Sequence, residues 1–194
     1  MRRSLLLLIL ILSLLLTACS IDKEAKIIEK IEKKYDDISY EVELEMRIIG
    51  KDKESLYRMK EIFVGDDEFY LEILEPMESK GITIEYKDDK LFLNHANIRQ
   101  SLSLKEVKNF DKGILLASFY EHLESIENIE LLEIEGKDYY KIKYRPEGHN
   151  RYNFQRHMYL SKKKLEPYMM EVLDEEGNIR VVIKYYDFTI KDDK

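Results

Sequence analysis

Residues 38–49 read ISYEVELEMRII, and apolar side chains occupy every second position from Ile38 to Ile48. Serine, glutamate or arginine side chains stand between them. Because successive side chains of a strand point to opposite faces of a sheet, this alternation predicts a strand with one buried and one solvated face. Gly50 begins a polar turn, where we expect the strand to end.

The same kind of pattern recurs along the rest of the chain. Strands are predicted at 55–64, 68–75, 81–87, 90–94, 129–135, 138–145, 152–160, 167–174 and 179–190. The segments between neighbouring strands are mostly short and rich in Gly, Asp and Asn, as turns are. Parallel crossovers need a dozen or more residues, so these short connections favour antiparallel hairpins.

Two segments instead show helical spacing. Residues 22–35 place Ile27, Ile28, Ile31 and Tyr35 on one face, which predicts an amphipathic helix. Residues 101–127 break the strand pattern, and a second helix is expected there behind Asp111, with an apolar face made of Ile114, Leu115, Phe119, Leu123 and Ile126. The predicted fold is therefore α+β: a curved, mostly antiparallel sheet, close to a half-open barrel, covered by two helical segments.

The N-terminus has the organisation of a secretory signal. Arg2 and Arg3 precede an apolar run over 5–16, and small residues lead into Cys19. The run is about a dozen residues long, whereas a spanning helix needs roughly 20. Residues 16–19, Leu-Thr-Ala-Cys, resemble the bacterial lipobox, which implies cleavage after residue 18 and a lipid on Cys19. We expect a signal peptide over 1–18, an anchored N-terminus over 19–21 and one domain over 22–194.

Charge restricts the classes of partner. The chain carries 32 Lys and Arg against 39 Asp and Glu, and loss of Arg2 and Arg3 leaves 30 against 39, or about −9. An acidic domain is a poor nucleic-acid binder, and its own charge would not hold it on an anionic membrane. The lipid on Cys19 is thus the expected membrane anchor, with the domain outside the cytoplasm.

The sequence offers no recognisable catalytic apparatus. Its four histidines, His95, His122, His149 and His157, lie in separate segments, and no His-Glu-x-x-His or Cys-x-x-Cys spacing is present. Glycine-rich phosphate loops and Gly-x-Ser-x-Gly elbows are missing too. We therefore predict a binding protein and not an enzyme, with no metal and no cofactor.

Residues 148–156 form a locally basic, aromatic-rich stretch in this acidic chain. Tyr and Arg are enriched at interface hot spots, so Arg151, Tyr152, Phe154 and Arg156 are candidate partner-binding residues, and Tyr168 is a further candidate. The alternative is that these aromatic side chains pack in the core. The strand over 38–49 is expected at a sheet edge, which suggests a homodimer with an exchanged strand as a hypothesis.

The order of these elements resembles the fold of the periplasmic lipoprotein carriers and their receptors, LolA and LolB. The segments that carry the resemblance are FVGDDEFYLEILEP (63–76), KGITIEYKDDKLFLN (80–94) and RHMYLSKKKLEPYMMEVLDEEGNIRVVIKYYDF (156–188). Carriers of this fold hold acyl chains, so a lipid-binding concave face is one functional hypothesis. An open apolar cavity would favour it, whereas a core filled by Tyr, Phe and Leu would favour a protein partner.

Within that fold, the chain resembles the clostridial germination lipoproteins of the GerS type. The resemblance lies in the lipobox, the length, and the stretches RMKEIFVGDDEFYLEILEPMESKGITIEYKDDKLFLNHANIRQS (58–101) and GHNRYNFQRHMYLSKKKLEPYMMEV (148–172). It implies a non-enzymatic partner of a zinc-dependent CwlD-type cell-wall amidase, acting on spore-cortex peptidoglycan in the space between the spore membranes, as germination requires.

Overall fold

The computed structural model describes residues 23–36, 38–65, 68–87, 90–105 and 115–191. Contacts divide the chain into two compact units, and the boundary in the sequence falls between Asp36 and Asp37. In the first unit the described residues form a helix over 23–35, which confirms the helix expected over 22–35. No helix in the described residues is long and apolar enough to cross a membrane. The signal peptide and Cys19 lie outside the described residues, so their roles remain predictions.

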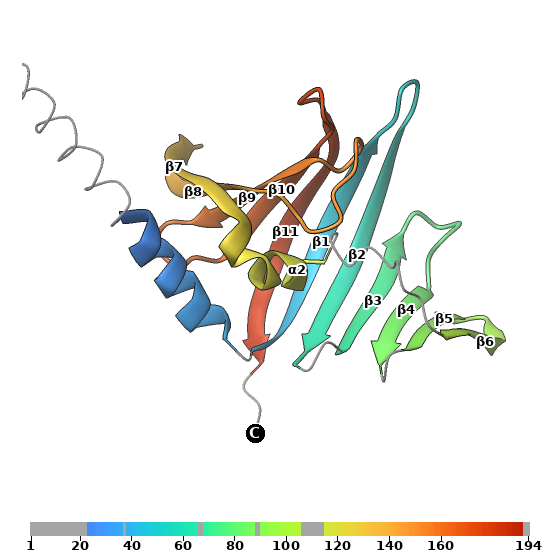
Figure 1. The fold of residues 1–194 in the computed structure, drawn as a ribbon. Coiled ribbons are helices and arrows are strands. Elements are labelled where there is room, and N and C mark those ends of the chain that lie inside the picture. Colours follow the sequence, from blue (N-terminus) through green and yellow to red (C-terminus); the bar gives the residue numbers. More distant parts are fainter. Residues whose placement is uncertain (1–22, 37, 66–67, 88–89, 106–114, 192–194) are drawn as a thin grey trace, which may run out of the picture. The chain divides into compact units, whose positions relative to one another are not determined.

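In the second unit, the described residues form one antiparallel sheet of 11 strands (Figure 1). Their bounds are β1 (Ser39–Ile49), β2 (Glu54–Val64), β3 (Glu68–Glu75), β4 (Ile82–Lys87), β5 (Lys90–His95), β6 (Ile98–Lys105), β7 (Ile126–Ile134), β8 (Lys137–Tyr144), β9 (Gln155–Ser161), β10 (Pro167–Leu173) and β11 (Ile179–Lys191). Their spatial order is β6-β5-β4-β3-β2-β1-β11-β10-β9-β8-β7. The sheet curves without closing, and the α+β fold predicted from the sequence is confirmed.

The alternation over 38–49 sets the two faces of this sheet. Tyr40, Val42, Leu44 and Met46 are buried on the concave face, with exposed fractions of 9% or less. Their neighbours in register on β2 and β11 include Phe63, Met59 and Tyr185, so the same face stays apolar across three strands. Burial of this face is the main contribution to the stability of the sheet.

The expectation that residues 38–49 form an edge strand is wrong. β1 pairs with β2 on one side and with β11 on the other, with Ser39 opposite Lys191. The first strand of the sheet therefore meets the last, a pairing between distant segments that local periodicity does not reveal. The outermost strands in the described order are β6 and β7.

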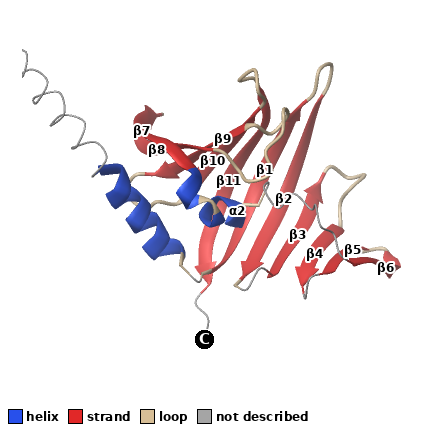
Figure 2. Ribbon diagram, viewed as in Figure 1, coloured by secondary structure: helices blue, strands red, loops and turns tan. Residues whose placement is uncertain are grey.

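The second helical segment is shorter than predicted. It consists of α2 (Ala117–Glu121) and the 3₁₀ turn η2 (Leu123–Ser125), coloured as helix in Figure 2. Residues 101–105, expected to lie outside the strands, belong instead to β6. Residues 106–114 of the predicted segment lie outside the described residues. Ile126 already has extended backbone and begins β7, which ends the helical segment.

Residues 115–119 and the concave face form a continuous apolar core. Leu115, Leu116 and Phe119 have exposed fractions of 2% or less. The ring of Phe119 lies edge-on to that of Tyr144 on β8, with centroids 5.3 Å apart. Leu115 also packs into a cluster with Phe69 on β3 and Leu91 on β5. The core under α2 is thus filled by aromatic and aliphatic side chains.

Candidate functional site

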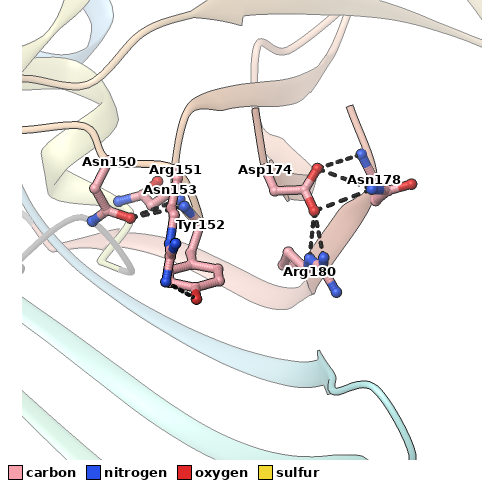
Figure 3. A network of polar contacts seen from close by, with 7 residues as sticks. All are labelled: Asn150, Arg151, Tyr152, Asn153, Asp174, Asn178 and Arg180. Carbon is pink, nitrogen blue, oxygen red and sulfur yellow. Dashed lines mark hydrogen bonds and ion pairs between the residues drawn. The ribbon is translucent and has the colours of Figure 1, made fainter. Parts of the chain in front are cut away.

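The turn formed by residues 150–153 carries two of the candidate partner-binding residues, Arg151 and Tyr152 (Figure 3). Asn150 Oδ1 accepts the backbone N–H groups of Tyr152 at 2.9 Å and Asn153 at 3.3 Å. The backbones of Asn150 and Asn153 also bond to each other in both directions. Asparagine favours such turns because its side chain replaces a backbone acceptor. The turn is therefore held by local hydrogen bonds.

Asp174, at the end of β10, fixes the neighbouring hairpin. Its carboxylate accepts the N–H of Asn178 at 2.7 Å and the Nε–H of Arg180 at 2.6 Å (Figure 3). Burial alone would raise the pKa of Asp174, but these hydrogen bonds and the charge of Arg180 outweigh it and lower the pKa. The backbone N–H of Glu175 then donates to the carbonyl of Arg151 at 3.0 Å. The hairpin thereby supports the turn at 150–153.

The outer side of this turn carries an exposed pair. The Arg151 guanidinium lies 4.5 Å from the ring centroid of Tyr152 and donates to its hydroxyl. Tyr152 is 59% exposed, so it does not pack in the core. A cation stacked on an aromatic ring loses little further conformational freedom on binding. Arg151 and Tyr152 therefore form a preorganised contact point for a partner.

Phe154 lies in a second, adjoining arrangement and is half-buried. The Arg145 guanidinium lies 4.4 Å from its ring centroid, and the His149 ring meets it edge-on. Arg145 also pairs with Glu127 at 3.1 Å. Arg145 and His149 line a surface pocket of about 630 Å³ that extends to α2 and η2. Phe154, through its contacts with Arg145 and His149, thus supports a concave surface beside the turn at 150–153.

Arg156 is placed differently from what its sequence position suggested. Its side chain is 1% exposed, on the same face as Met158 and Leu160. The Nε–H donates to Asn153 Oδ1 at 3.1 Å, and Nη1 donates to Ser118 Oγ at 3.4 Å. Arg156 therefore links the turn at 150–153 to α2 from inside the molecule, and a partner would not contact it directly in this conformation.

Tyr168 does not join this group. It lies near the start of β10, whereas residues 150–154 lie beside the end of that strand, because Leu173 pairs with Gln155. The Tyr168 ring instead packs on Tyr139 with centroids 4.5 Å apart. The five candidate residues thus separate into an exposed pair, a half-buried ring, a buried cation and a distant tyrosine.

Sequence reasoning did not single out Glu61, a fully buried carboxyl group on β2. It accepts the N–H of Leu116 at 3.0 Å and the hydroxyl of Tyr40. Burial raises its pKa to about 7, although both hydrogen bonds act in the opposite direction. The sequence feature that could have identified Glu61 as buried is its position between Met59 and Phe63, because strand alternation turns all three side chains to one face. Arg156 likewise stands at an alternate position between two apolar residues, Phe154 and Met158.

The histidines do not assemble with acids into a metal centre. Within the described ranges, no three His, Cys, Asp or Glu side chains lie close enough to hold a metal ion. His157 Nδ1 pairs with Glu171 at 3.1 Å, and Tyr159 donates to the same carboxylate at 2.9 Å. This pairing lowers the pKa of Glu171, chiefly through the hydrogen bond from His157. The cluster joins β9 and β10 across the sheet.

Comparison with models of known protein families assigns the chain to one family. A family model described as sporulation protein YdcC-like matches residues 1–193. The chain belongs to the YdcC-like sporulation protein family. No curated protein sequence matches this YdcC-like chain.

Three solved structures illustrate the range of similarity in fold. A conserved protein from Thermus thermophilus aligns with a TM-score of 0.57 and 16% identity, covering 88% of this YdcC-like chain and 89% of that chain. The structure of the Clostridioides difficile CwlD amidase in complex with the GerS lipoprotein aligns with a TM-score of 0.52 and 23% identity, covering 85% of this chain and 94% of that chain. A LolA superfamily protein from Nitrosomonas europaea aligns with a TM-score of 0.46 and 18% identity, covering 88% of this chain and 94% of that chain. The resemblance to GerS-type proteins predicted from the sequence is confirmed as a likeness of fold.

Proposed function

We propose that this YdcC-like protein is a non-enzymatic partner of a CwlD-type cell-wall amidase and activates it during the maturation of spore-cortex peptidoglycan. The amidase, and its zinc ion, would supply the chemistry. This chain would supply a binding surface, and Cys19 would tether that surface to a membrane outside the cytoplasm through its lipid.

One observation carries the proposal: the fold is shared with a structure that contains the GerS lipoprotein bound to CwlD, over 85% of this chain. Membership of a sporulation family adds independent support for the process. Two polar groups buried in the described core, Glu61 and Arg156, hold α2 on the sheet. A role in binding fits these features better than a catalytic one.

The Arg151–Tyr152 pair is the surface that we assign to this contact. It combines two residue types that are enriched at interface hot spots, and the hairpin at Asp174 holds it in position. The adjoining pocket at Arg145 and His149 would receive a side chain of the partner. The proposal therefore predicts that the amidase covers the end of the sheet where β10 meets β11.

The test is a titration of the full chain, purified in non-ionic detergent, into the purified amidase, with amidase activity measured in parallel. Tyr152→Ala and Arg151→Glu are each expected to weaken binding by about ten-fold or more, the loss of a hot-spot contact. Tyr186→Ala is the matched control, because Tyr186 on β11 is 47% exposed and lies outside the turn at 150–153. Equal affinity of all four proteins would exclude this surface as the contact.

A second function, binding of an acyl chain, is favoured by one feature. Leu93, Ile98 and Leu102, on β5 and β6, are 38 to 59% exposed, and Leu104 beside them is 42% exposed. Their register places them on the face that continues into the apolar core, since Leu91 opposes Leu104 and Leu93 opposes Leu102. Such an apolar row on a sheet face is the kind of surface that lipids and protein partners cover.

A Cys19→Ser chain, which lacks its own lipid attachment site, separates the two functions. Acyl binding predicts that it takes up a fluorescent fatty acid and that Leu102→Glu abolishes the uptake. Leu56→Glu is the control, because Leu56 is 53% exposed on the opposite face of the sheet. Absence of uptake, or equal loss in both variants, would exclude the acyl-binding function.

A further inference from the structure

A second pocket lies at the opposite end of β9 and β10 from the Arg151–Tyr152 pair. It has a volume of about 920 Å³, within the range of small-ligand sites. Its walls come from the start of β8 and from the turn between β9 and β10. Tyr139, Tyr140, Pro167 and Tyr168 give it apolar surface, and lysines surround these rings: Lys137, Lys162, Lys163 and Lys164.

Hydrogen bonds preorganise this pocket. The backbone N–H of Lys162 donates to the carbonyl of Asp138 at 3.0 Å, and its ammonium group pairs with the Asp138 carboxylate at 2.8 Å. Within the β9–β10 turn, Ser161 Oγ accepts the N–H of Glu166 at 3.1 Å. Two hairpins are thus tied together before any ligand arrives, which lowers the entropic cost of binding.

The charge of the pocket is opposite to that of the whole domain. Its two acids are already engaged, Asp138 with Lys162 at 2.8 Å and Glu166 with Lys164 at 3.5 Å. Among the described residues, Lys137 and Lys163 make no ion pair, so their charges are available to a ligand. Glu135 lies near Tyr168, where burial first and this carboxylate second raise the pKa of the phenol. An excess of cations in so acidic a protein marks a site for an anion.

The aromatic walls identify the ligand further. Tyr139 is 7% exposed and packs behind its neighbour, while the half-buried Tyr168 offers the more accessible ring. Flat rings beside lysines suit a ligand with apolar ring faces and carboxylates along its edge. A membrane surface is a poorer match, because the site is concave and the domain around it carries net negative charge.

We propose that this Lys- and Tyr-lined pocket binds an acidic glycan, a sugar chain bearing carboxylates, with sugar faces on Tyr168 and carboxylates on Lys137 and Lys163. That the glycan is cell-wall peptidoglycan rests on the proposed function. The pocket would then hold the substrate strand near the partner enzyme while the Arg151–Tyr152 pair, at the other end of the strands, contacts the enzyme itself.

The experiment measures binding by the full chain alone, in detergent and at low salt, with no amidase present. The probe is a carboxylate-bearing disaccharide peptide released from peptidoglycan, and a neutral N-acetylglucosamine oligomer is the comparison. Saturable binding of the acidic probe is expected, at least about ten-fold tighter than that of the neutral one, as one or two added ion pairs would give in a partly enclosed site. Raising the salt concentration should weaken it.

Variants separate the two parts of the pocket. Lys163→Glu and Tyr168→Ala are each expected to weaken binding by about ten-fold, whereas Tyr168→Phe keeps the ring and should retain most of the affinity. Lys51→Glu, an equal charge reversal in the exposed β1–β2 turn at the other end of the strands, should have no effect. Lys163 is exposed, so its variant tests the pocket without disturbing the core.

Two results would overturn this assignment: no binding of the acidic probe, or equal binding of the neutral oligomer. Failure of the amidase titration would leave this measurement untouched, since the enzyme is absent from it. Failure here would likewise leave the amidase contact standing.

Discussion

The carboxylate of Glu61 on β2 accepts the backbone N–H of Leu116 at 3.0 Å, just before α2 begins. A buried cation, Arg156 on β9, donates to Ser118 within α2. The short helix is therefore attached to the concave face by one carboxyl group and one guanidinium from opposite halves of the sheet. Its five residues have no side-chain N-cap, so these contacts and apolar packing keep it in place.

The raised pKa of Glu61 predicts a pH dependence of stability. Because the folded state holds this proton up to about pH 7 while the unfolded state releases it near 4.5, the free energy of unfolding falls as pH rises between these values. The loss amounts to at most about 3 kcal/mol. Chemical denaturation at pH 5 and pH 8 measures it. Glu61→Gln should remove this component, so a wild-type minus variant difference that is constant with pH would contradict the prediction.

The hairpin at Asp174 should control the order of the turn at 150–153. Asp174→Asn weakens the contact with Arg180 and is expected to speed hydrogen exchange at the amides of Glu175 and Asn178, which the hairpin and turn protect. Because the pKa of Asp174 is lowered, its contribution to stability holds at neutral pH and disappears as the pH falls through the folded-state value. Unchanged exchange at both amides would show that the carboxylate does not support the turn.

Phe119 provides an apolar contact between α2 and the sheet. It is fully buried and meets the rings of Tyr120 and Tyr144 edge-on. Phe119→Ala is expected to lower the free energy of unfolding by about 3–5 kcal/mol, through lost burial and the cavity left behind. Leu56→Ala, an exposed apolar truncation on β2, should cost far less. Similar costs for both would mean that α2 does not pack as described.

Gly81 and Gly136 form a matched pair for backbone strain. Both have positive φ, at 82° and 75°, but a Cβ at Gly81 would lie 3.1 Å from Cβ of Ala96 while one at Gly136 meets nothing within 4 Å. Gly136→Ala should cost about 1–2 kcal/mol from backbone strain alone. Gly81→Ala should cost more, because Ala96 has to shift. Thermal unfolding of both variants checks the order, and the reverse order would contradict it.

Ten of the strands could be predicted because their side chains alternate and short polar turns separate them. β6 was not predicted, because Gln100 interrupts the alternating apolar positions Ile98, Leu102 and Leu104. The central position of β1 depends on its pairing with β11, almost the whole chain away, which no local pattern encodes.

The candidate site was predicted in part for a related reason. The basic, aromatic composition of residues 148–156 pointed to the turn at 150–153, and Arg151 and Tyr152 lie exposed on it. Composition does not tell which side chain faces outward, however, and Arg156 lies inside with its charge held by Asn153 and Ser118. Tyr168 was grouped with these residues by type, although strand register separates it from them.

Binding of the amidase tests the central claim most directly. The full detergent-purified chain is titrated calorimetrically into a CwlD-type amidase, with hydrolysis of peptidoglycan followed in the same samples. We predict saturable binding, a rise in amidase activity on complex formation, and weaker binding by Tyr152→Ala but not by Tyr186→Ala. No heat of binding together with unchanged hydrolysis would contradict the proposed function.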